Sequence, residues 1–365
     1  MELTVKQENL SKALNIISKI ASERTSLPIL SNVLLRTNGS RLLIAATDLE
    51  IAISQNIGAK IEKVGEIAIP PKLVSEFISN LPRENVFLKV EGEHLLIESG
   101  NYKSKINGVM SSDFPELPTV DRENSKKISI PVEVFRTAIS QTEFTASTDL
   151  ARPILTGIYW HTFENNLYFA ATDGYRLSEK RIFEYDGEVS AIVPTSAVRE
   201  VMRAISDSTE TIEVYIDEDQ IEFSVDDIVI VSRLIDGKFV DYRKLIPSDT
   251  ETKIDISKAD FSRIVKIAAL FARDSGGSVT LRADGENSKL SIHSIASEFG
   301  ESNSEADAEI FGDGEVTLNP TYLLKGISSV SGSDIQFGFS GKLAPTVMKS
   351  PADKDYIHII MPLKS

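Results

Sequence analysis

Hydrophobic and polar residues alternate along much of the chain with the two-residue period of half-buried β-strands. Segments 212–216 and 221–225 carry Ile, Val or Phe at every second position and are separated by the polar turn 217–220. Segment 86–90 alternates in the same way and runs into a turn at 91–93. Patterns of this kind predict antiparallel hairpins with one buried face.

A spacing of three to four residues marks amphipathic helices between these strands. Leu10, Leu14 and Ile17 follow this spacing. The same pattern predicts six helices, at residues 8–21, 72–81, 132–145, 196–205, 257–273 and 320–331. Helices and antiparallel strands mixed in this way indicate an α+β fold.

The chain repeats itself with a period of about 125 residues. Ala46-Thr47-Asp48 recurs as Ala171-Thr172-Asp173, and Leu30 lines up with Leu155 at the same offset. A fainter third copy matches around residues 317–320 but lacks the Ala-Thr-Asp sequence. The repeat predicts three tandem domains, each with two helices packed on antiparallel sheets. The expected domains are residues 1–120, 126–248 and 252–365.

Composition sets the outer limits of the protein class. The chain has 365 residues and 41% hydrophobic content, enough for two or three domains with a core each. It has no Cys, which excludes a disulfide scaffold and thiolate metal sites and fits a reducing cytoplasm. Residues 1–6 do not resemble a signal peptide, and no apolar run reaches the roughly 18 residues that span a bilayer. We expect a soluble cytoplasmic protein.

The net charge of −15 disfavours nucleic acid, because an acidic protein repels a polyanion. The distribution of charge is uneven, however. The six predicted helices hold 11 basic and 6 acidic residues, so they carry +5 while the remainder of the chain carries −20. A basic helical face would suit DNA, but Lys and Arg also favour helices by propensity. Charge alone leaves both interpretations open.

The most specific motif is the stretch from Thr172 to Leu177, and other motifs flank it in a fixed order. They are Thr25-Ser26-Leu27-Pro28-Ile29-Leu30-Ser31-Asn32, Ala46-Thr47-Asp48-Leu49-Glu50, Asp113-Phe114-Pro115, Asp236-Gly237-Lys238-Phe239, Asp241-Tyr242-Arg243 and Met361-Pro362-Leu363. Over the whole chain, this order resembles the bacterial DNA polymerase III beta subunit, the family of replicative sliding clamps.

The resemblance implies three similar domains per chain and a ring closed by two chains joined head to tail. Pairing each end strand with a second copy would remove the unpaired sheet edges. The helices would line a hole around duplex DNA, and the ring would tether the replicative DNA polymerase and other replication and repair proteins for processivity. The resemblance implies neither catalytic activity nor a cofactor. An ATP-dependent clamp loader would open the ring, because the sequence has no P-loop of its own.

The resemblance also implies DNA contacts from basic residues on or beside the helices. Arg24, in a turn after the first helix, matches a position that touches DNA, although it could equally be an ordinary solvated arginine. The other candidates are Lys12, Lys19, Lys72, Arg136, Arg199, Arg203, Arg263, Lys266 and Lys325. Such non-specific contacts weaken steeply with salt, so retention on DNA would rest on ring closure.

A second implied site is an apolar pocket between the second and third domains that binds a short peptide motif of partner proteins. The matching positions are Leu155, Thr172, Gly174, Tyr175, Arg176, Leu177, Val240, Leu245, Asn319, Tyr322, Leu343, Pro345, Ile359, Met361, Pro362 and Leu363. Aliphatic and Met side chains make an adaptable floor, and Arg176 and the Asn319 amide could orient a peptide backbone. Taken singly, most of these residues fit core or turn roles equally well, so the interpretation rests on their co-occurrence.

Three features near this pocket depart from the family pattern. Lys244 stands where clamps often carry Arg, and Tyr175 where His is frequent. Segment 274–277 is rich in Gly, including Gly276 and Gly277, where a bulky apolar residue can border the pocket. These departures predict a more open rim.

The resemblance implies a dimer interface through a few residues at the two ends of the chain. The candidates are Ile106 in an edge strand, Lys72, and Leu270 with Phe271 near the end of the fifth helix. Lys72 could meet acidic residues between 298 and 305, whereas Leu270 and Phe271 fit a core role equally well.

The residues give little support to an enzyme. The four His residues lack the spacing of metal ligands. Asp48 and Glu50, or Asp173 with a distant carboxylate, could be the carboxylate pair of a glycosidase, but recurrence of Ala-Thr-Asp favours a structural turn. Beside the favoured sliding clamp, two hypotheses remain: a β-rich carbohydrate-active enzyme, and a repeat scaffold that binds peptides without encircling DNA.

Overall fold

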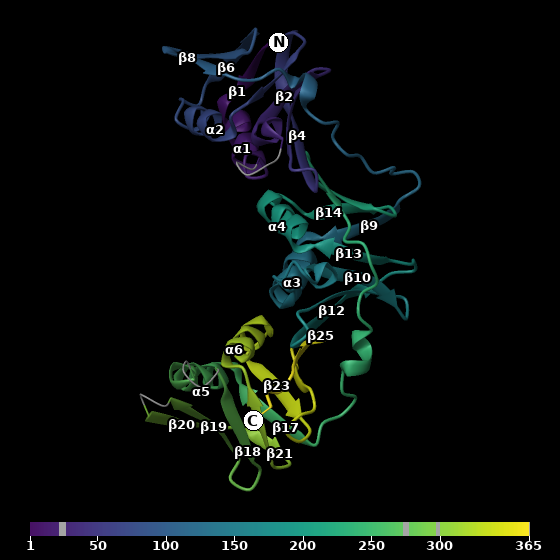
Figure 1. The fold of residues 1–365 in the computed structure, drawn as a ribbon, viewed down its shortest axis with the longest axis vertical. Coiled ribbons are helices and arrows are strands. Elements are labelled where there is room, and N and C mark those ends of the chain that lie inside the picture. The colour runs from purple at the N-terminus through teal and green to yellow at the C-terminus, as the bar shows by residue number, and fades with distance from the viewer. Residues whose placement is uncertain (22–26, 273–276, 297–299, 365) are drawn as a thin grey trace. The chain divides into compact units, whose positions relative to one another are not determined.

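The computed structural model describes residues 1–21, 27–272, 277–296 and 300–364. The chain, whose helices and strands are labelled in Figure 1, forms two compact units, each assembled from two segments. Unit 1 contains Met1–Glu133 and Ser196–Leu234, and unit 2 contains Val134–Thr195 and Ile235–Ser365. The middle of the three predicted repeats therefore contributes to both units.

All six predicted helices are present, and each ends one to four residues earlier than predicted. They are α1 (Gln7–Ile17), α2 (Pro71–Ser79), α3 (Val132–Thr142), α4 (Thr195–Ala204), α5 (Lys258–Phe271) and α6 (Pro320–Ser329). The difference arises because the apolar spacing continues into the turns that follow. Residues 143–145, for example, form a 3-10 turn rather than a fourth turn of α3.

Unit 1 is built on one antiparallel sheet whose main path is β8-β7-β6-β1-β4-β16-β15-β14-β9, with β3 beside β4 and β2 and β5 following it. The strands are β1 (Glu2–Lys6), β2 (Val33–Asn38), β3 (Arg41–Thr47), β4 (Ile51–Lys63), β5 (Glu66–Ile69), β6 (Asn85–Glu91), β7 (His94–Ser99), β8 (Tyr102–Asn107), β9 (Lys126–Pro131), β14 (Thr211–Ile216), β15 (Gln220–Val225) and β16 (Ile228–Arg233). Both predicted hairpins, β6–β7 and β14–β15, are confirmed.

Unit 2 contains two antiparallel sheets, ordered β13-β10-β11-β12-β25-β24-β23-β17-β21 and β20-β19-β18-β22. The strands are β10 (Gly157–Phe163), β11 (Asn166–Thr172), β12 (Arg176–Glu184), β13 (Ser190–Pro194), β17 (Thr252–Ser257), β18 (Val279–Asp284), β19 (Lys289–Ala296), β20 (Gly300–Asp307), β21 (Glu309–Phe311), β22 (Gly314–Leu318), β23 (Asp334–Phe339), β24 (Thr346–Ser350) and β25 (Asp353–Ile360). Helices α5 and α6 pack against each other, and their buried residues share a core with both sheets.

The buried apolar faces of helices and strands hold each unit together. In unit 1, Leu10, Leu14 and Ile17 of α1 are almost completely buried, as their helical spacing predicts. In unit 2, Phe261 of α5 packs into a cluster with Phe337 of β23. Burial of these apolar surfaces is the main contribution to the stability of both units.

Two strand pairings join consecutive repeats in the same way. In unit 1, β4 of the first repeat pairs with β16, the last strand of the second, with Ile51 opposite Ser232. In unit 2, β12 of the second repeat pairs with β25, the last strand of the third, with Arg176 opposite Ile360. The repeat seen in the sequence is therefore also a repeat of strand register.

Among the described residues, no helix combines the length and the apolar character that crossing a membrane requires.

Gly326 of α6 provides a test of the packing between this helix and β25. A Cβ atom at this position would lie 2.6 Å from Cδ2 of the fully buried His358. Alanine gains about 1 kcal/mol in helix propensity, but overpacking two buried elements typically costs about 1–3 kcal/mol. We expect Gly326→Ala to lower the thermal midpoint, measured by circular dichroism. Ser328→Ala, at an exposed position of the same helix, should change it little, and a raised midpoint for Gly326→Ala would contradict the close approach.

Candidate functional site

The turn between β11 and β12 is held by the side chains of the second Ala-Thr-Asp sequence. The Thr172 hydroxyl donates to the Arg176 carbonyl over 2.6 Å and accepts from the Gly174 amide over 3.0 Å. Oδ1 of Asp173 accepts from the amides of Tyr175 and Arg176 at 2.9 and 3.0 Å. Gly174 has a φ of 94°, a conformation that glycine adopts without strain.

The first copy makes the same turn with the same atoms. The Thr47 hydroxyl donates to the Ile51 carbonyl, and Oδ1 of Asp48 accepts from the amides of Glu50 and Ile51. Both aspartates are thus occupied in local turn hydrogen bonds. This geometry fits the structural turn role that the sequence favours for Asp48.

What distinguishes the second turn is Arg176, which replaces the apolar Ile51 of the first. Its Nε donates to Oδ2 of Asp173 over 2.9 Å, and only 7% of the residue is exposed. The guanidinium lies 4.5 Å from the centre of the Tyr322 ring and 5.5 Å from that of Phe144. Arg176 therefore forms an ion pair within the turn, and its cation–π contact with Tyr322 ties the turn to α6.

Asn319, the other residue expected to orient a peptide, is the N-cap of α6. Its Oδ1 accepts from the amides of Thr321 and Tyr322 at 2.8 and 3.2 Å. The amide oxygen is thus already engaged within the chain. A direct contact of Arg176 or Asn319 with a peptide stays a prediction.

The pairing of β12 with β25 brings residues far apart in the sequence into one place. Leu177 lies opposite Ile359. Beyond the paired region, the Met361 amide donates to the Tyr175 carbonyl over 2.8 Å, and the Leu363 amide to the Thr317 carbonyl over 2.9 Å. The C-terminal segment is therefore fixed beside the Thr172–Leu177 turn.

A buried apolar cluster lies under this junction. Leu155, Leu177 and Ile359 pack together with Phe239 and Tyr242 from the segment that follows residue 234. Large apolar side chains remain exposed on the flanking segments, namely Tyr175 (58%), Val240 (41%), Leu245 (52%) and Leu343 (60%). Thr172 is buried, Gly174 is exposed, and Pro345, Met361, Pro362 and Leu363 are half-buried. An apolar floor with exposed apolar flanks is typical of a binding surface.

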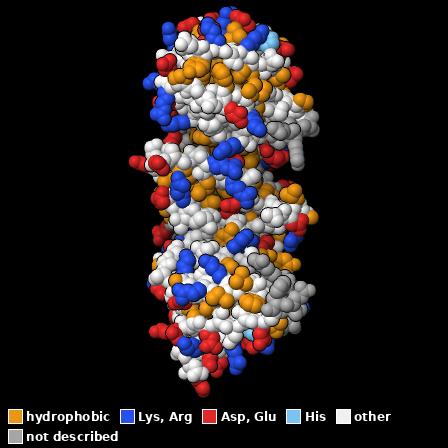
Figure 2. Space-filling model, turned by 90° about the vertical axis from the view of Figure 1, so that its left-hand side faces the viewer, with side chains coloured by type: hydrophobic (Ala, Val, Ile, Leu, Met, Phe, Trp, Pro, Cys, Tyr) orange, Lys and Arg blue, Asp and Glu red, His pale blue; other side chains and the backbone are white. Residues whose placement is uncertain are grey.

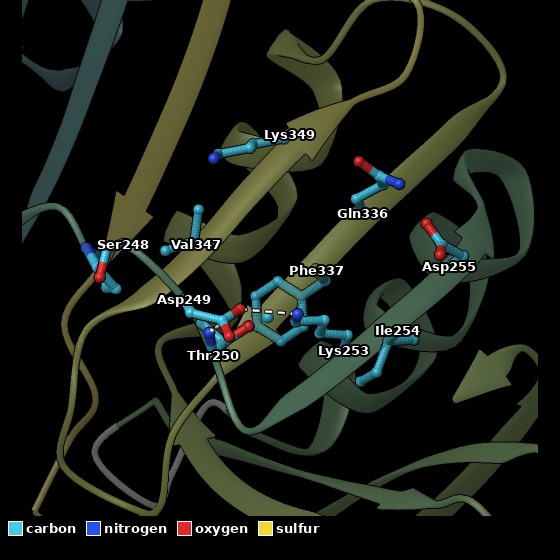
Figure 3. A pocket seen from close by; sticks show the side chains of 12 residues that line it. Ser248, Asp249, Thr250, Lys253, Ile254, Asp255, Gln336, Phe337, Val347 and Lys349 are labelled. Atoms are coloured by element: carbon cyan, nitrogen blue, oxygen red, sulfur yellow. Dashed lines mark hydrogen bonds and ion pairs between the residues drawn. The ribbon is translucent and has the colours of Figure 1, made fainter. Parts of the chain in front are cut away.

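The segment 235–251, which we call the connector, lies on the face of the sheet that carries Leu177 and Ile359. Thr250 lies over Gly338, where a Cβ atom would stand 2.4 Å from the Thr250 hydroxyl. Figure 3 shows the small hollow beside it, where Asp249 forms an ion pair of 2.7 Å with Lys253 and Lys349 extends from β24. The two acidic and two basic side chains that line this hollow give it a net charge of zero. Its lining residues do not form a group that resembles a catalytic or metal-binding site.

His358 sits behind the junction as a fully buried neutral group. Its Nδ1 lies 2.9 Å from the Ser178 hydroxyl, and its ring lies 5.4 Å from that of Phe144. Burial, together with the nearby Arg176 charge, lowers the pKa of His358 to about 3. A residue of this kind supports packing and is not poised for acid–base chemistry at neutral pH.

The predicted DNA-contacting residues lie on or beside the helices in both units. Lys12, Lys72, Arg199, Arg203, Arg263, Lys266 and Lys325 are exposed on helices, Lys19 is exposed in the turn after α1, and Arg136 is half-buried on α3. Arg203 and Arg263 form ion pairs within their helices, with Glu200 and Asp260. Figure 2 shows Lys and Arg side chains mixed with acidic and hydrophobic ones on the faces turned to the viewer.

The charge balance of the helices is slightly smaller than the sequence suggested. Lys19 and Glu143 fall outside helices, and Arg273 lies outside the described residues, so the described helices carry nine basic and five acidic residues. Arg24, Arg273 and the segment 274–276 lie outside the described residues, so the DNA contact of Arg24 and the openness of the rim at Gly276 stay predictions. Gly277 adopts a φ of 73°.

The predicted interface residues differ in how much surface they offer. Leu270 is 61% exposed and Phe271 is half-buried, so Leu270 is not a core residue. Ile106 is only 4% exposed because it packs within unit 1, opposite Leu95. Lys72 is exposed on α2. An interface role for all four stays a prediction.

Sequence models of the DNA polymerase III beta subunit match residues 1–118 as its N-terminal domain, 129–241 as its central domain and 243–364 as its C-terminal domain. The chain belongs to the DNA polymerase III beta subunit family. Among curated relatives, it is 29% identical to the beta sliding clamp of Staphylococcus epidermidis and 27% identical to that of Bacillus subtilis, each over the full length of both chains.

Solved structures of clamps have the same fold. The Bacillus subtilis sliding clamp superposes with a TM-score of 0.95 at 27% identity, covering 100% of this chain and 99% of that one. A clamp from Bartonella birtlesii, solved bound to griselimycin, gives 0.94 at 26% identity and full coverage of both chains. The fold predicted for this sliding clamp, three tandem α+β domains, is thereby confirmed.

The departures from the family pattern lie at the edges of the site. Lys244 is exposed and forms an ion pair of 2.5 Å with Asp241, and Tyr175 projects from the turn with 58% exposure. No group of three or more His, Asp or Glu within the described ranges is arranged to hold a metal ion. The sequence did not predict the contacts of Asp173 and Phe144 with Arg176. Asp173 belongs to the Thr172–Leu177 motif, whereas Phe144 lies far from it in the sequence and carries no such signal.

His358 generates a prediction about acid stability. A buried neutral His with a folded-state pKa near 3 and an unfolded value near 6.5 takes up its proton on unfolding between these pH values. Its contribution to stability is therefore complete above pH 6.5 and falls as the pH is lowered, by about 1.4 kcal/mol per pH unit. Between pH 6.5 and 5.0, we expect the free energy of unfolding, measured in urea, to fall more steeply for the native chain than for His358→Gln. Equal slopes would show that His358 is not buried as a neutral group.

Proposed function

We propose that this clamp closes into a ring around duplex DNA as a head-to-tail homodimer and tethers the replicative DNA polymerase and other replication or repair proteins. The observation that carries the proposal is the similarity to sliding clamps over the entire chain, including both repeat junctions. The clamp would act as an accessory factor in the cytoplasm without catalysis of its own. The proposed domains are residues 1–120, 126–248 and 252–365.

Two end strands support the closure of such a ring. β8 lies at the end of the unit 1 sheet and carries Lys103 and Lys105, whereas β20 lies at the end of a unit 2 sheet and carries Glu301, Glu305 and Asp307. Opposite charges on two unpaired edges favour pairing β8 of one copy with β20 of another. Leu270, exposed on α5 beside β20, would add apolar contact.

The basic helices support the DNA side of the proposal. The candidate residues are spread over all six helices, a pattern suited to weak contacts with a phosphate backbone rather than to reading bases. Retention would come from the closed ring, which a separate ATP-dependent clamp loader would open.

The cluster at the β12–β25 junction supports the capture of partner peptides. Its floor of Leu155, Leu177 and Ile359 is buried, while Val240, Leu245 and Leu343 offer exposed apolar contacts. The griselimycin-bound relative shows that a clamp of this fold accepts a ligand. We place the partner peptide, and griselimycin, on this cluster.

Ring closure predicts that retention depends on DNA topology. The protein would be loaded onto nicked circular DNA with clamp loader and ATP, and the DNA would then be linearised. We expect the clamp to remain on circles and to slide off linear DNA, as measured by gel filtration of labelled protein. Blocking both DNA ends with bound protein should restore retention. Retention that is unchanged by linearisation would contradict encirclement.

The C-terminal segment predicts a separable defect in partner binding. Deleting residues 361–365 removes the Met361 amide bond to Tyr175 and the apolar groups of Met361 and Leu363, while β25 remains complete. We expect polymerase affinity, measured by surface plasmon resonance, to fall more than tenfold, with an unchanged native mass. Deleting only residues 364–365 serves as the control. Unchanged affinity in the longer deletion would refute the assignment of the pocket.

A further inference from the structure

The connector carries two of the exposed apolar residues beside the proposed pocket, Val240 and Leu245. It contains only one short helical turn, Tyr242–Leu245, and forms no strand. A segment with so little regular structure requires tertiary contacts to hold its position beside the pocket, because fixing the backbone of each residue has an entropy cost of about 1–2 kcal/mol.

A buried polar network fastens the connector to the sheet at Tyr242. The Tyr242 hydroxyl donates to Oε2 of Glu179 on β12 and lies 2.6 Å from Nε2 of His161 on β10. A His161 ring protonated at Nε2 donates to that hydroxyl, so each proton in the chain from His161 to Glu179 has an acceptor. All three side chains, those of Tyr242, Glu179 and His161, are buried.

Arg243 adds a second fastening at the next residue. Its Nη2 lies 3.0 Å from Oε2 of Glu179, and its guanidinium lies 4.0 Å from the Phe163 ring centre and 4.2 Å from that of Tyr168. One carboxylate on β12 therefore holds two consecutive connector residues. Burial raises the pKa of Glu179, although the Tyr242 hydroxyl and the Arg243 charge oppose this rise.

The first repeat shows what the same frame looks like without this network. There, Phe114 and Leu117 pack on Ala45 and Ala68 as Phe239 and Tyr242 pack on Ala170 and Ile192. Strand register places Ser54 where the second repeat has Glu179, and Ala52 where it has Leu177.

At the first junction, the apolar Leu117 therefore stands where the second has Tyr242. The first connector is fastened by a different pair, Arg122 with the buried Glu222 of β15. A charged fastening is thus common to both junctions, whereas the second adds a buried tyrosine hydroxyl bonded to a strand carboxylate. Burying such groups is costly, so simple packing does not explain them.

We infer that Glu179, Tyr242 and Arg243 are positioning residues for partner binding, which hold the connector so that Val240 and Leu245 face the ligand. The inference rests on the proposed peptide site. The network itself contacts no ligand and acts through the two connector residues.

The test compares two Tyr→Phe variants of the full-length protein. Tyr242→Phe keeps the ring but removes the hydroxyl from Glu179 and His161. Tyr159→Phe removes a hydroxyl from the same sheet, where it bonds the exposed Ser190, and is the matched control. Binding is measured by calorimetry with griselimycin and with the purified replicative polymerase.

We expect Tyr242→Phe to weaken binding of both ligands about five- to twentyfold, and Tyr159→Phe to leave it unchanged. Hydrogen exchange of amides 236–246 should rise in Tyr242→Phe, with β10–β12 still protected. Glu179→Gln keeps an acceptor for Tyr242 but removes the charge that pairs with Arg243, so it should also weaken binding. A native chain that binds neither ligand would overturn the proposed function. Binding that is equally tight in Tyr242→Phe would overturn the positioning role alone.

A double-mutant cycle with Leu245→Ala separates positioning from general destabilisation. If Tyr242 acts through Leu245, the Tyr242→Phe change should cost much less affinity in the Leu245→Ala background than in the native one. Fully additive losses, with equal thermal midpoints, would contradict the inference.

Discussion

The arrangement of unit 2 depends on the pairing of β12 with β25. This pairing joins residues 176–180 to residues 356–360, so a strand of the second repeat and the last strand of the chain form one continuous sheet. Because side chains alternate between faces, a slip of one residue would move Leu177 and Ile359 away from the apolar cluster and would turn Ser178 and His358 toward it. The buried contacts of Ser178, Tyr356 and His358 on the opposite face resist such a slip. The register is therefore fixed from both faces of the sheet.

The two repeat junctions show how one backbone frame supports different surfaces. Both use the same Thr and Asp hydrogen bonds in the turn and the same register in the strand that follows. At the first junction, the positions after the turn are Ile51 and Ala52, which are small or apolar. At the second, they are Arg176 and Leu177. The turn itself is thus scaffold in both copies, and the difference lies in what the next residues contact.

The sequence was sufficient for the architecture because its signals are local or periodic. The strand alternation of 212–225 and the helical spacing of Leu10 and Leu14 reflect burial on one face, which the structure confirms. The helix ends were less accurate, since an apolar spacing does not distinguish an α-turn from the 3-10 turn at 143–145. The contacts of Arg176 with Tyr322 and Phe144 join separate segments of the chain. The hydrogen bond between Ser178 and Tyr356 joins residues 178 positions apart. No sequence period encodes contacts of this kind.

The polar groups at the second junction favour binding over catalysis. Asp173 is held by turn amides and Arg176, and Glu179 by Tyr242 and Arg243, so neither carboxylate is directed at an open site. His161 and His358 are buried, and burial lowers the pKa of each well below neutrality. What this junction exposes instead is apolar surface on three separate chain segments, around Tyr175, Leu245 and Leu343. A surface of this composition gains free energy by excluding water from a ligand of matching shape, and its ionised groups serve to keep the segments in place.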